Sequence, residues 1–329
     1  MKNILVTGCA GFIGFHVSRR LLEAGHRVAG FDNLNSYYDE GLKEARLARL
    51  RERDGFTFVK GDIAHAASVN ELFKPRSFDC VVHLAAQPGV RHSLEEPQLY
   101  IQSNVLGFTN VIEAAHRRGT GHFVFASSSS VYGANTKIPF SETDNVDHPI
   151  SVYGATKKAD ELLAYAYAHL YRFPVTGLRF FTVYGPWGRP DMALFKFCRA
   201  ILDGTPIPAF NQGRMVRDFT YVEDAAECVA RVVECSRAEL PPAEAGAAPY
   251  RIYNVGSSHT IEIVELVKLL EHAIGRPAQV EWLPSQPGDV PRTFADNQNF
   301  FATFGYRPST PIAEGVNRFV AWFREFYKK

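Results

Sequence analysis

A tyrosine and a lysine in the pattern Tyr153-x-x-x-Lys157 follow, along the chain, a run of four serines (SSSS, residues 127–130). Residues i and i+4 share one face of a helix, so the ammonium group is expected beside the phenol. A free tyrosine loses its proton only near about pH 10, but a neighbouring cation stabilises the phenolate. Such a pair can take the proton of a substrate hydroxyl while a hydride leaves the same carbon.

A second candidate functional motif lies near the start of the chain, in the segment VTGCAGFIG. Glycines between a strand and a helix let a pyrophosphate approach the backbone, and the helix N-terminus adds free N–H groups and a positive dipole end. The next apolar run ends in Asp32, whose carboxylate would accept bonds from ribose hydroxyls and repel a 2′-phosphate, so NAD is favoured over NADP. The predicted cofactor-binding residues here are Gly8, Gly11, Phe12, Ile13, Gly14, Asp32 and Asn33.

Later strand ends extend the predicted cofactor site. In GDI, Asp62 and Ile63 would offer adenine a carboxylate and an apolar edge, and in HLAA the small side chains would let the cofactor lie against the backbone. Small residues at the end of a buried strand serve packing alone equally often. Asn104, within a helix expected over residues 100–119, either contacts the nicotinamide side or fills the helix interior. The further predicted cofactor-binding residues are Asp62, Ile63, Leu84, Ala85, Ala86, Asn104, Tyr153 and Lys157.

The elements that must position these residues alternate in type along the first half of the chain. Nearly all-apolar strand patterns alternate with helical patterns up to residue 180, which predicts a parallel sheet with helices on both faces. The predicted fold is α/β, a Rossmann-type doubly wound parallel sheet with a smaller α/β C-terminal lobe. We expect an NAD-binding domain at residues 1–180, with returning segments near 217–260. Residues 181–329 would mainly form the substrate lobe.

Composition limits the classes of partner. The 329 residues are 46% hydrophobic with a formal net charge of +1, so neither nucleic acid nor a membrane is expected as a partner. No apolar run approaches the roughly 20 residues of a membrane span, and the start MKNILVTG has no signal-peptide pattern. Five scattered cysteines suit a reducing compartment, and we expect a cytoplasmic protein. The histidines show no ligand spacing, so no metal is predicted.

Longer motifs point to a family. LRFFTVYGP, RDFTYVED, NVG and PGDVPRTFAD accompany the glycines and the Tyr153–Lys157 pair. Over essentially its whole length the chain resembles the extended short-chain dehydrogenase/reductases, in their nucleotide-sugar epimerase branch. The segments DNLNSYYD, LKEARL, QPGVRHS and GPWGRPDMA are most similar to those of UDP-glucuronate 4-epimerases.

This resemblance implies an isomerase that converts UDP-glucuronic acid to UDP-galacturonic acid. NAD, tightly bound and regenerated each cycle, would transiently oxidise C4, the 4-keto intermediate would rotate, and C4 would be reduced again without decarboxylation. The resemblance gives catalytic roles to Tyr153, Lys157, Ser128 and Ser130, with Ser128 bonding the C4 hydroxyl. Related dehydratases carry an Asp-Glu pair at positions 129 and 130, and decarboxylases carry Glu at 130, where this chain has serines. An epimerase of neutral UDP-hexoses or UDP-pentoses remains the alternative, and a catalytically silent NAD-binding protein is disfavoured.

The resemblance also implies how the substrate is held. A 4-keto uronic acid tends to lose CO2, so its carboxylate must be held out of alignment with the carbonyl by hydrogen-bond donors such as Ser130, Thr182 and Arg189. Arg217 and Arg292 match contacts to the diphosphate and ribose, and Arg91 is a weaker candidate. Helices near residues 100–118 and 153–171 would pair with those of a second copy in a homodimer, or only cover their own sheet. The predicted substrate-binding residues are Ser128, Ser129, Ser130, Thr182, Arg189, Arg217 and Arg292.

Overall fold

The computed structural model describes residues 1–235, 247–284 and 290–329. The first three residues of the PGDVPRTFAD motif, and part of the segment expected to return near 217–260, lie outside the described residues.

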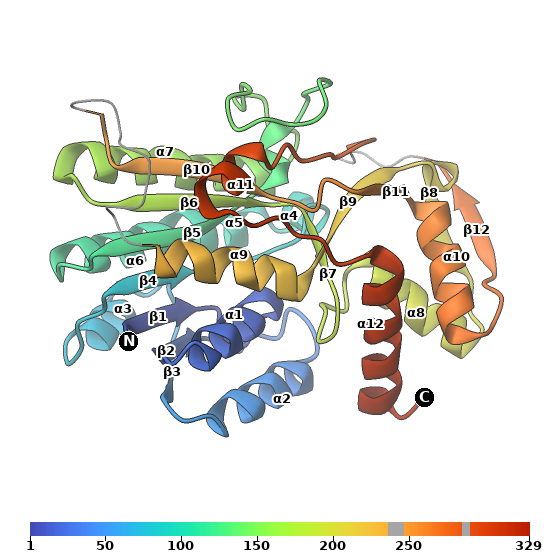
Figure 1. Cartoon of the computed structure of the whole chain (residues 1–329), viewed down its shortest axis with the longest axis horizontal. Helices are drawn as coiled ribbons and strands as arrows, with labels where there is room; N and C mark the ends of the chain where they lie inside the picture. The colour runs from blue at the N-terminus through green and yellow to red at the C-terminus, as the bar shows by residue number, and fades with distance from the viewer. Residues whose placement is uncertain (236–246, 285–289) are drawn as a thin grey trace.

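A parallel sheet of seven strands forms the centre of the molecule (Figure 1), in the order β10-β6-β5-β4-β1-β2-β3. The order reverses between β1 and β4, which places a crevice at the carboxyl ends of these strands. The register aligns Thr7 with His83 and Ser128 with Phe180, so the loops that follow these strands leave one edge of the sheet. The strands are β1 (Asn3–Thr7), β2 (Arg27–Asp32), β3 (Phe56–Lys60), β4 (Cys80–His83), β5 (His122–Ser128), β6 (Val175–Phe180) and β10 (Tyr250–Val255).

Helices cover both faces of this sheet, as the apolar strands require. One buried cluster joins the sheet to α1 and α9, and a second joins the opposite face to α3, α6 and α7. The predicted parallel sheet with two covered faces is therefore confirmed. The helices of this half are α1 (Phe12–Glu23), α2 (Glu40–Arg51), α3 (Ala66–Phe73), α4 (His92–Glu95), α5 (Pro97–Tyr100), η1 (Ile101–Leu106), α6 (Gly107–Arg117), η2 (Ser129–Tyr132), α7 (Val152–Tyr171) and α9 (Val222–Glu234).

The helix expected over residues 100–119 is not one regular α-helix. Its first part is a π-helix, η1, and regular α-helix begins only at Gly107. Asn104 lies inside the π-helix, where its side-chain oxygen accepts from the backbone N–H of Gln87 at 2.7 Å and its amide donates to the Gln87 carbonyl at 3.1 Å. Single π-turns within helices are frequent at functional sites. This one brings an inward-facing amide against the loop after β4.

The C-terminal lobe, on the right of Figure 1, packs around aromatic side chains. Trp187, Phe195, Phe319 and Phe323 are buried in one cluster there. The strand β11 runs antiparallel to β9, while β7 with β9 and β12 with β8 run parallel. The elements of this lobe are β7 (Thr182–Tyr184), α8 (Ala193–Asp203), β8 (Ile207–Phe210), η3 (Asn211–Gly213), β9 (Val216–Tyr221), β11 (Thr260–Glu262), α10 (Ile263–Ile274), β12 (Val280–Leu283) and α12 (Ile312–Tyr327). The helix α11 (Gln298–Phe304) instead packs against β10 of the central sheet, where Phe300 contacts Tyr253.

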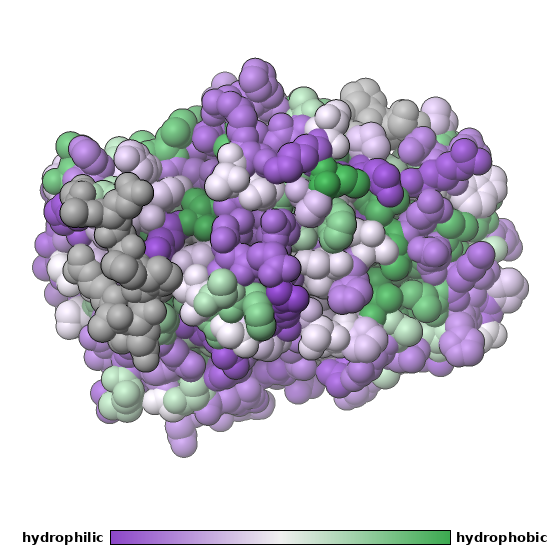
Figure 2. Space-filling model, turned by 45° about the horizontal axis from the view of Figure 1, so that its top comes forward, coloured by the Kyte–Doolittle hydropathy of each residue, from purple (hydrophilic) through white to green (hydrophobic). Residues whose placement is uncertain are grey.

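The surface is mainly hydrophilic on the face seen in Figure 2, with apolar side chains in separate patches. Within the described ranges, none of the helices has both the length and the hydropathy needed to cross a membrane.

Candidate active site

The glycine turn between β1 and α1 has no room for side chains. Gly8 has a φ of +73°, and a Cβ on it would lie 2.8 Å from the backbone nitrogen of Ala85. A Cβ on Gly14 would collide with the carbonyl oxygen of Gly8. Gly11 caps α1 and has no side chain that could accept from the first N–H groups of the helix. Residues 11–14 line a large cavity at the carboxyl ends of the strands. The turn therefore leaves backbone donors and a positive helix end for an anion.

Asp32 ends β2 and lines the same cavity. Its carboxylate accepts from the backbone N–H of Ala10 at 3.1 Å and from that of Leu34 at 2.9 Å. Burial raises the pKa of Asp32, and the bond from Leu34 and the charge of Lys43 act in the opposite direction. Lys43 also lines the cavity, and its ammonium donates to the Asn35 carbonyl at 2.6 Å.

The next strand ends add to this cavity wall. Asn33 donates from its amide to Asp62 at 2.9 Å, so the loops after β2 and β3 are tied together. Thr7 accepts from the backbone N–H groups of Leu84 and Ala85, both at 3.2 Å, and this fixes the loop after β4. The predicted cofactor residues that line this cavity are Gly8, Gly11, Phe12, Ile13, Gly14, Asp32, Asn33, Asp62, Ile63, Leu84, Ala85, Ala86, Tyr153 and Lys157.

Asn104 is the one predicted cofactor residue that does not line either described cavity. Its side chain is buried, and besides Gln87 its amide contacts the hydroxyl of Thr156 at 3.0 Å. That hydroxyl donates in turn to the carbonyl of Tyr153 at 2.8 Å. Asn104 thus lies behind the cavity wall and links the loop after β4 to the first turns of α7.

Tyr153 and Lys157 lie in the first two turns of α7. The helix begins there because Ser151 caps it, accepting from the N–H of Gly154 at 3.0 Å. The backbone N–H of Tyr153 donates to the hydroxyl of Ser93 at 3.1 Å, which fixes the start of the helix against α4. Both side chains line the large cavity, as their i, i+4 spacing predicts.

The four serines separate into different environments. Ser127 and Ser128 line the large cavity, whereas Ser129 and Ser130 begin the short helix η2 and line neither described cavity. The hydroxyl of Ser128 accepts from the backbone N–H of Ser130 at 3.2 Å. Ser130 therefore lies next to Ser128 but outside both cavities, and it is half-buried.

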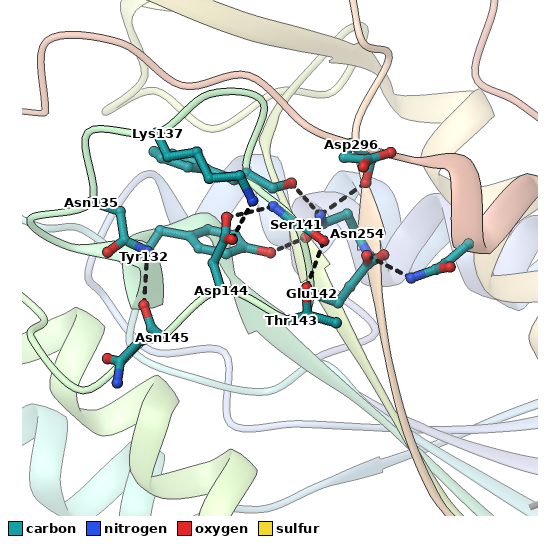
Figure 3. Close-up of polar contacts among 12 residues, drawn as sticks. Tyr132, Asn135, Lys137, Ser141, Glu142, Thr143, Asp144, Asn145, Asn254 and Asp296 are labelled. Carbon is teal, nitrogen blue, oxygen red and sulfur yellow. Dashed lines mark hydrogen bonds and ion pairs between the residues drawn. The ribbon is translucent and has the colours of Figure 1, made fainter.

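Beyond η2, a polar network holds the loop 133–148 in place (Figure 3). The Tyr132 hydroxyl donates to the Asn254 side-chain oxygen at 2.6 Å, and the Asn254 amide donates to the carbonyls of Phe140 and Asp296, both at 2.9 Å. The backbone N–H of Asn254 donates to Glu142 at 2.9 Å. Asn254 of β10 thus joins η2, the loop 133–148 and the segment before α11.

A second cavity continues from the first into the C-terminal lobe. Phe12, Val183, Arg189 and Met192 line both cavities, so the two are adjoining. Arg189 pairs with Asp191 through two hydrogen bonds, Nε to Oδ1 at 3.0 Å and an η nitrogen to Oδ2 at 2.8 Å. Burial lowers the pKa of Arg189, but Asp191 outweighs it and the net shift is upward.

The remaining predicted substrate residues lie in or near the second cavity. Thr182 and Arg217 line it. Arg217 donates to the carbonyls of Val216 at 2.9 Å and Pro291 at 3.3 Å. Arg292 is exposed and lines neither described cavity, but its backbone bridges to Val216, beside Arg217. Arg91 lies over the ring of Phe210, 4.3 Å from its centroid.

Several residues of the site had escaped sequence reasoning. Asn35, Tyr37, Tyr38 and Lys43 line the large cavity from the loop after β2 and from α2. The fully buried Arg46 donates to the Ala10 carbonyl at 2.9 Å and also to the carbonyls of Trp187 and Gly188. The segment DNLNSYYD contains three of these residues, but the sequence resemblance singled out none of them as a site residue.

These residues fit a dinucleotide. The turn that a Cβ would fill, the helix start without a side-chain cap and the carboxylate at the end of β2 are the three features that bind a pyrophosphate and a ribose. Across the described ranges, histidine, cysteine and carboxylate side chains form no group of three that could hold a metal ion.

Comparisons with known proteins agree with this geometry. Residues 4–256 match the NAD dependent epimerase/dehydratase family. A probable UDP-glucuronate 4-epimerase of Rhizobium meliloti (strain 1021) is 46% identical over 338 residues, which cover 99% of this chain and 98% of that protein.

Solved structures are similar over the whole chain. The UDP-glucuronic acid 4-epimerase of Bacillus cereus, in complex with UDP-glucuronic acid and NAD, gives a TM-score of 0.91 at 31% identity, covering 99% of this chain and 100% of that one. The UDP-glucose 4-epimerase of Thermus thermophilus, in complex with NAD, gives 0.85 at 30% identity, covering 98% and 99%. The chain therefore belongs to the NAD dependent epimerase/dehydratase family.

Proposed function

We propose that the protein is an isomerase, an NAD-dependent UDP-glucuronate 4-epimerase that forms UDP-galacturonic acid. The observation that carries this proposal is that two cavities adjoin and share lining residues. Tyr153, Lys157 and Ser128 line the dinucleotide cavity, and Arg189 lies where that cavity opens into the second one. The relatives in this family that act on UDP-glucuronic acid support the same substrate.

The cofactor of this reaction is NAD, held by the glycine turn, Asp32 and the ends of β3 and β4. When bound, NAD supplies a reversible hydride acceptor for C4 of the sugar. The Tyr153 phenolate takes the proton from O4 and later returns it, while the Lys157 ammonium stabilises the phenolate. Ser128, at the end of β5, is the hydroxyl proposed to bond O4 and to pass the proton to Tyr153.

The side chains around the sugar must also keep CO2 on the intermediate. A carboxyl group at position 129 or 130 would offer an acid or base for elimination, and this chain has hydroxyls at both positions. We assign Arg189 and Thr182, which line the second cavity, to hold the uronate by hydrogen bonds. Ser130 is proposed to assist through Ser128, whose hydroxyl accepts from the Ser130 N–H.

The diphosphate is assigned to the second cavity. Arg217 lines it, and the backbone of Arg292 runs beside Arg217 at the rim. Guanidinium groups suit a diphosphate because each can donate two hydrogen bonds to its oxygens.

The discriminating experiment compares UDP-glucuronic acid with UDP-glucose and a UDP-pentose, side by side, under the same conditions. The proposal expects the highest kcat/KM for UDP-glucuronic acid. A higher kcat/KM for UDP-glucose or the UDP-pentose would favour the alternative, a 4-epimerase of neutral UDP-sugars, and overturn the proposed substrate.

We further propose a homodimer. Large apolar side chains are exposed on neighbouring elements: Leu99, Ile101 and Leu106 on α5 and η1, and Leu162 and Tyr165 on α7. An exposed apolar group of this kind marks an interaction surface, and a second copy would cover it with the same helices. Light scattering after size-exclusion chromatography tests this, with Leu162→Glu expected to give monomers.

A cytoplasmic location is proposed as well. Four buried cysteines are free thiols: Cys9, Cys80, Cys198 and Cys228. Free thiols persist in reducing compartments. Detection of the protein in the cytoplasmic fraction of its cells would test this location.

A further inference from the structure

The Lys157 ammonium has a carboxylate partner that the proposed reaction does not use. Its Nζ donates to Oδ2 of Asp160 at 3.1 Å, and only 3% of the lysine side chain and 1% of the aspartate side chain are exposed. Positions 153, 157 and 160 follow the i, i+4, i+7 spacing of one helix face. The phenol, the ammonium and the carboxylate therefore follow one another along the face of α7 that borders the cavity.

The other ionisable groups around this pair are already compensated. Glu161 on the same helix receives two hydrogen bonds from Arg179 of β6, at 2.8 and 2.9 Å. His83 of β4 is uncharged near neutral pH, because burial, together with the Lys157 charge, lowers its pKa to about 3. Among the described residues, Asp160 is thus the carboxylate that hydrogen-bonds Lys157, whereas Glu161 pairs with Arg179.

The Asp160 carboxylate makes fewer hydrogen bonds than a buried carboxylate usually does. Its Oδ1 is buried and has no hydrogen-bond partner among the described residues. Burial raises the pKa of Asp160 to about 7, against the opposing effect of Lys157, and Glu161 raises it further. A buried carboxylate with one free oxygen is destabilising on its own, so its place beside Lys157 calls for a role in the site.

We propose that Asp160 is a positioning residue for the reaction. Its carboxylate holds the Lys157 ammonium at the cavity floor, and the ionised form of that carboxylate limits how strongly the ammonium stabilises the Tyr153 phenolate. This role rests on the proposed function, in which Tyr153 must both take a proton and return it within one cycle. A phenolate that is stabilised too strongly would return the proton slowly.

The test measures the ionisation of Tyr153 directly. The near-ultraviolet absorbance of tyrosinate is followed against pH in the wild type and in Tyr153→Phe, and the difference reports the Tyr153 phenol alone. The same pair of curves is recorded in the background of Asp160→Asn and of Asp160→Ala, which remove the charge, and of Asp160→Glu, which keeps it. Asp147→Asn is the matched control, because Asp147 pairs at 3.5 Å with Lys158, the next residue along α7.

Removal of the charge is expected to shift the midpoint of the Tyr153 titration to lower pH by about one pH unit, the size of a charge effect at an effective dielectric constant of about 20. Asp160→Glu and Asp147→Asn should keep the wild-type midpoint. The acid limb of the kcat/KM profile should move together with the titration. An unmoved midpoint in both uncharged variants would overturn the proposal, even if their turnover were lower. The titration needs no substrate, so a wild type that fails to epimerise UDP-glucuronic acid would contradict the proposed function and not this role.

Discussion

The hydroxyl of Ser127 donates to Oε1 of Glu161 at 2.6 Å, inside the protein. This bond joins the end of β5, which carries the serine turn, to α7, which carries Tyr153 and Lys157. Arg179 of β6 donates to both oxygens of the same Glu161, so three neighbouring elements meet at one carboxylate. The relative position of Ser128 and Tyr153 therefore depends on a buried ion pair that touches neither cavity directly.

Glu161→Ala is expected to lower the free energy of unfolding by about 3–5 kcal/mol, because it leaves the buried Arg179 without its anion. Chemical denaturation measures this loss. Glu314→Ala is the control, since the Arg318–Glu314 pair is about half exposed and such pairs contribute about 0–1 kcal/mol. Equal effects of the two substitutions would contradict the role given to the buried pair.

Tyr153→Phe should keep the fold and reduce turnover by about 10²–10⁴-fold, the usual contribution of a positioned acid–base group. Turnover of UDP-glucuronic acid by NMR and the melting temperature together check this. Tyr171→Phe, at the exposed C-terminal end of the same helix, should leave both unchanged. Wild-type turnover in Tyr153→Phe would show that another group moves the proton.

Arg189→Ala should raise the KM for UDP-glucuronic acid by about 10–100-fold, the value of a lost charge-assisted hydrogen bond. The KM for UDP-glucose, which has no carboxylate, should change much less, and the ratio of released CO2 to epimer should rise. Lys196→Ala, an exposed cation on α8, serves as the control. An unchanged KM together with an unchanged CO2 ratio would remove Arg189 from the uronate site.

Two buried histidines predict an acid sensitivity. Burial lowers the pKa of His16 and of His83 to about 3 from the ordinary 6.5. Below about pH 6.5 the histidines bind protons in the unfolded chain but not in the folded protein, so unfolding takes up protons. The stability that comes from keeping them uncharged is complete above that pH and is lost as the pH falls toward 3. Each histidine should contribute a slope of up to about 1.4 kcal/mol per pH unit.

Denaturation curves at several pH values between 4 and 7 measure this slope. His83→Gln should reduce the slope of the unfolding free energy against pH by the contribution of one histidine, whatever the substitution does to stability at neutral pH. His169→Gln, at an exposed position of α7, should leave the slope as in the wild type. A slope that does not change in His83→Gln would contradict the assignment.

The local parts of the site were predictable from the sequence. The glycine turn, the carboxylate at the end of β2 and the Tyr153–Lys157 pair each depend on a few adjacent residues whose geometry follows from helix and strand periods. The same reasoning extended by one helical turn would have reached Asp160, which lies seven residues after Tyr153 on the same face. Nothing but its position signalled it, since a lone aspartate on a helix is usually exposed.

The other parts depend on contacts between distant segments. Tyr132 bonds Asn254 across 122 residues of sequence, and Ser127 bonds Glu161 across 34. The sequence alone therefore assigns no role to Ser127, although its hydroxyl joins β5 to α7. Asn104 depends on the π-turn, which the regular helical pattern of its neighbours conceals. The helices α9, α10 and α12 were likewise not predicted one by one, because the strand–helix alternation used for the prediction ends at residue 180.

NMR of UDP-glucuronic acid incubated with the purified protein, first without added NAD and then with it, tests the proposed epimerisation most directly. The expected result is a mixture of UDP-glucuronic acid and UDP-galacturonic acid, with no UDP-pentose and no released CO2. Formation of a decarboxylated product, or no conversion even with NAD added, would contradict it.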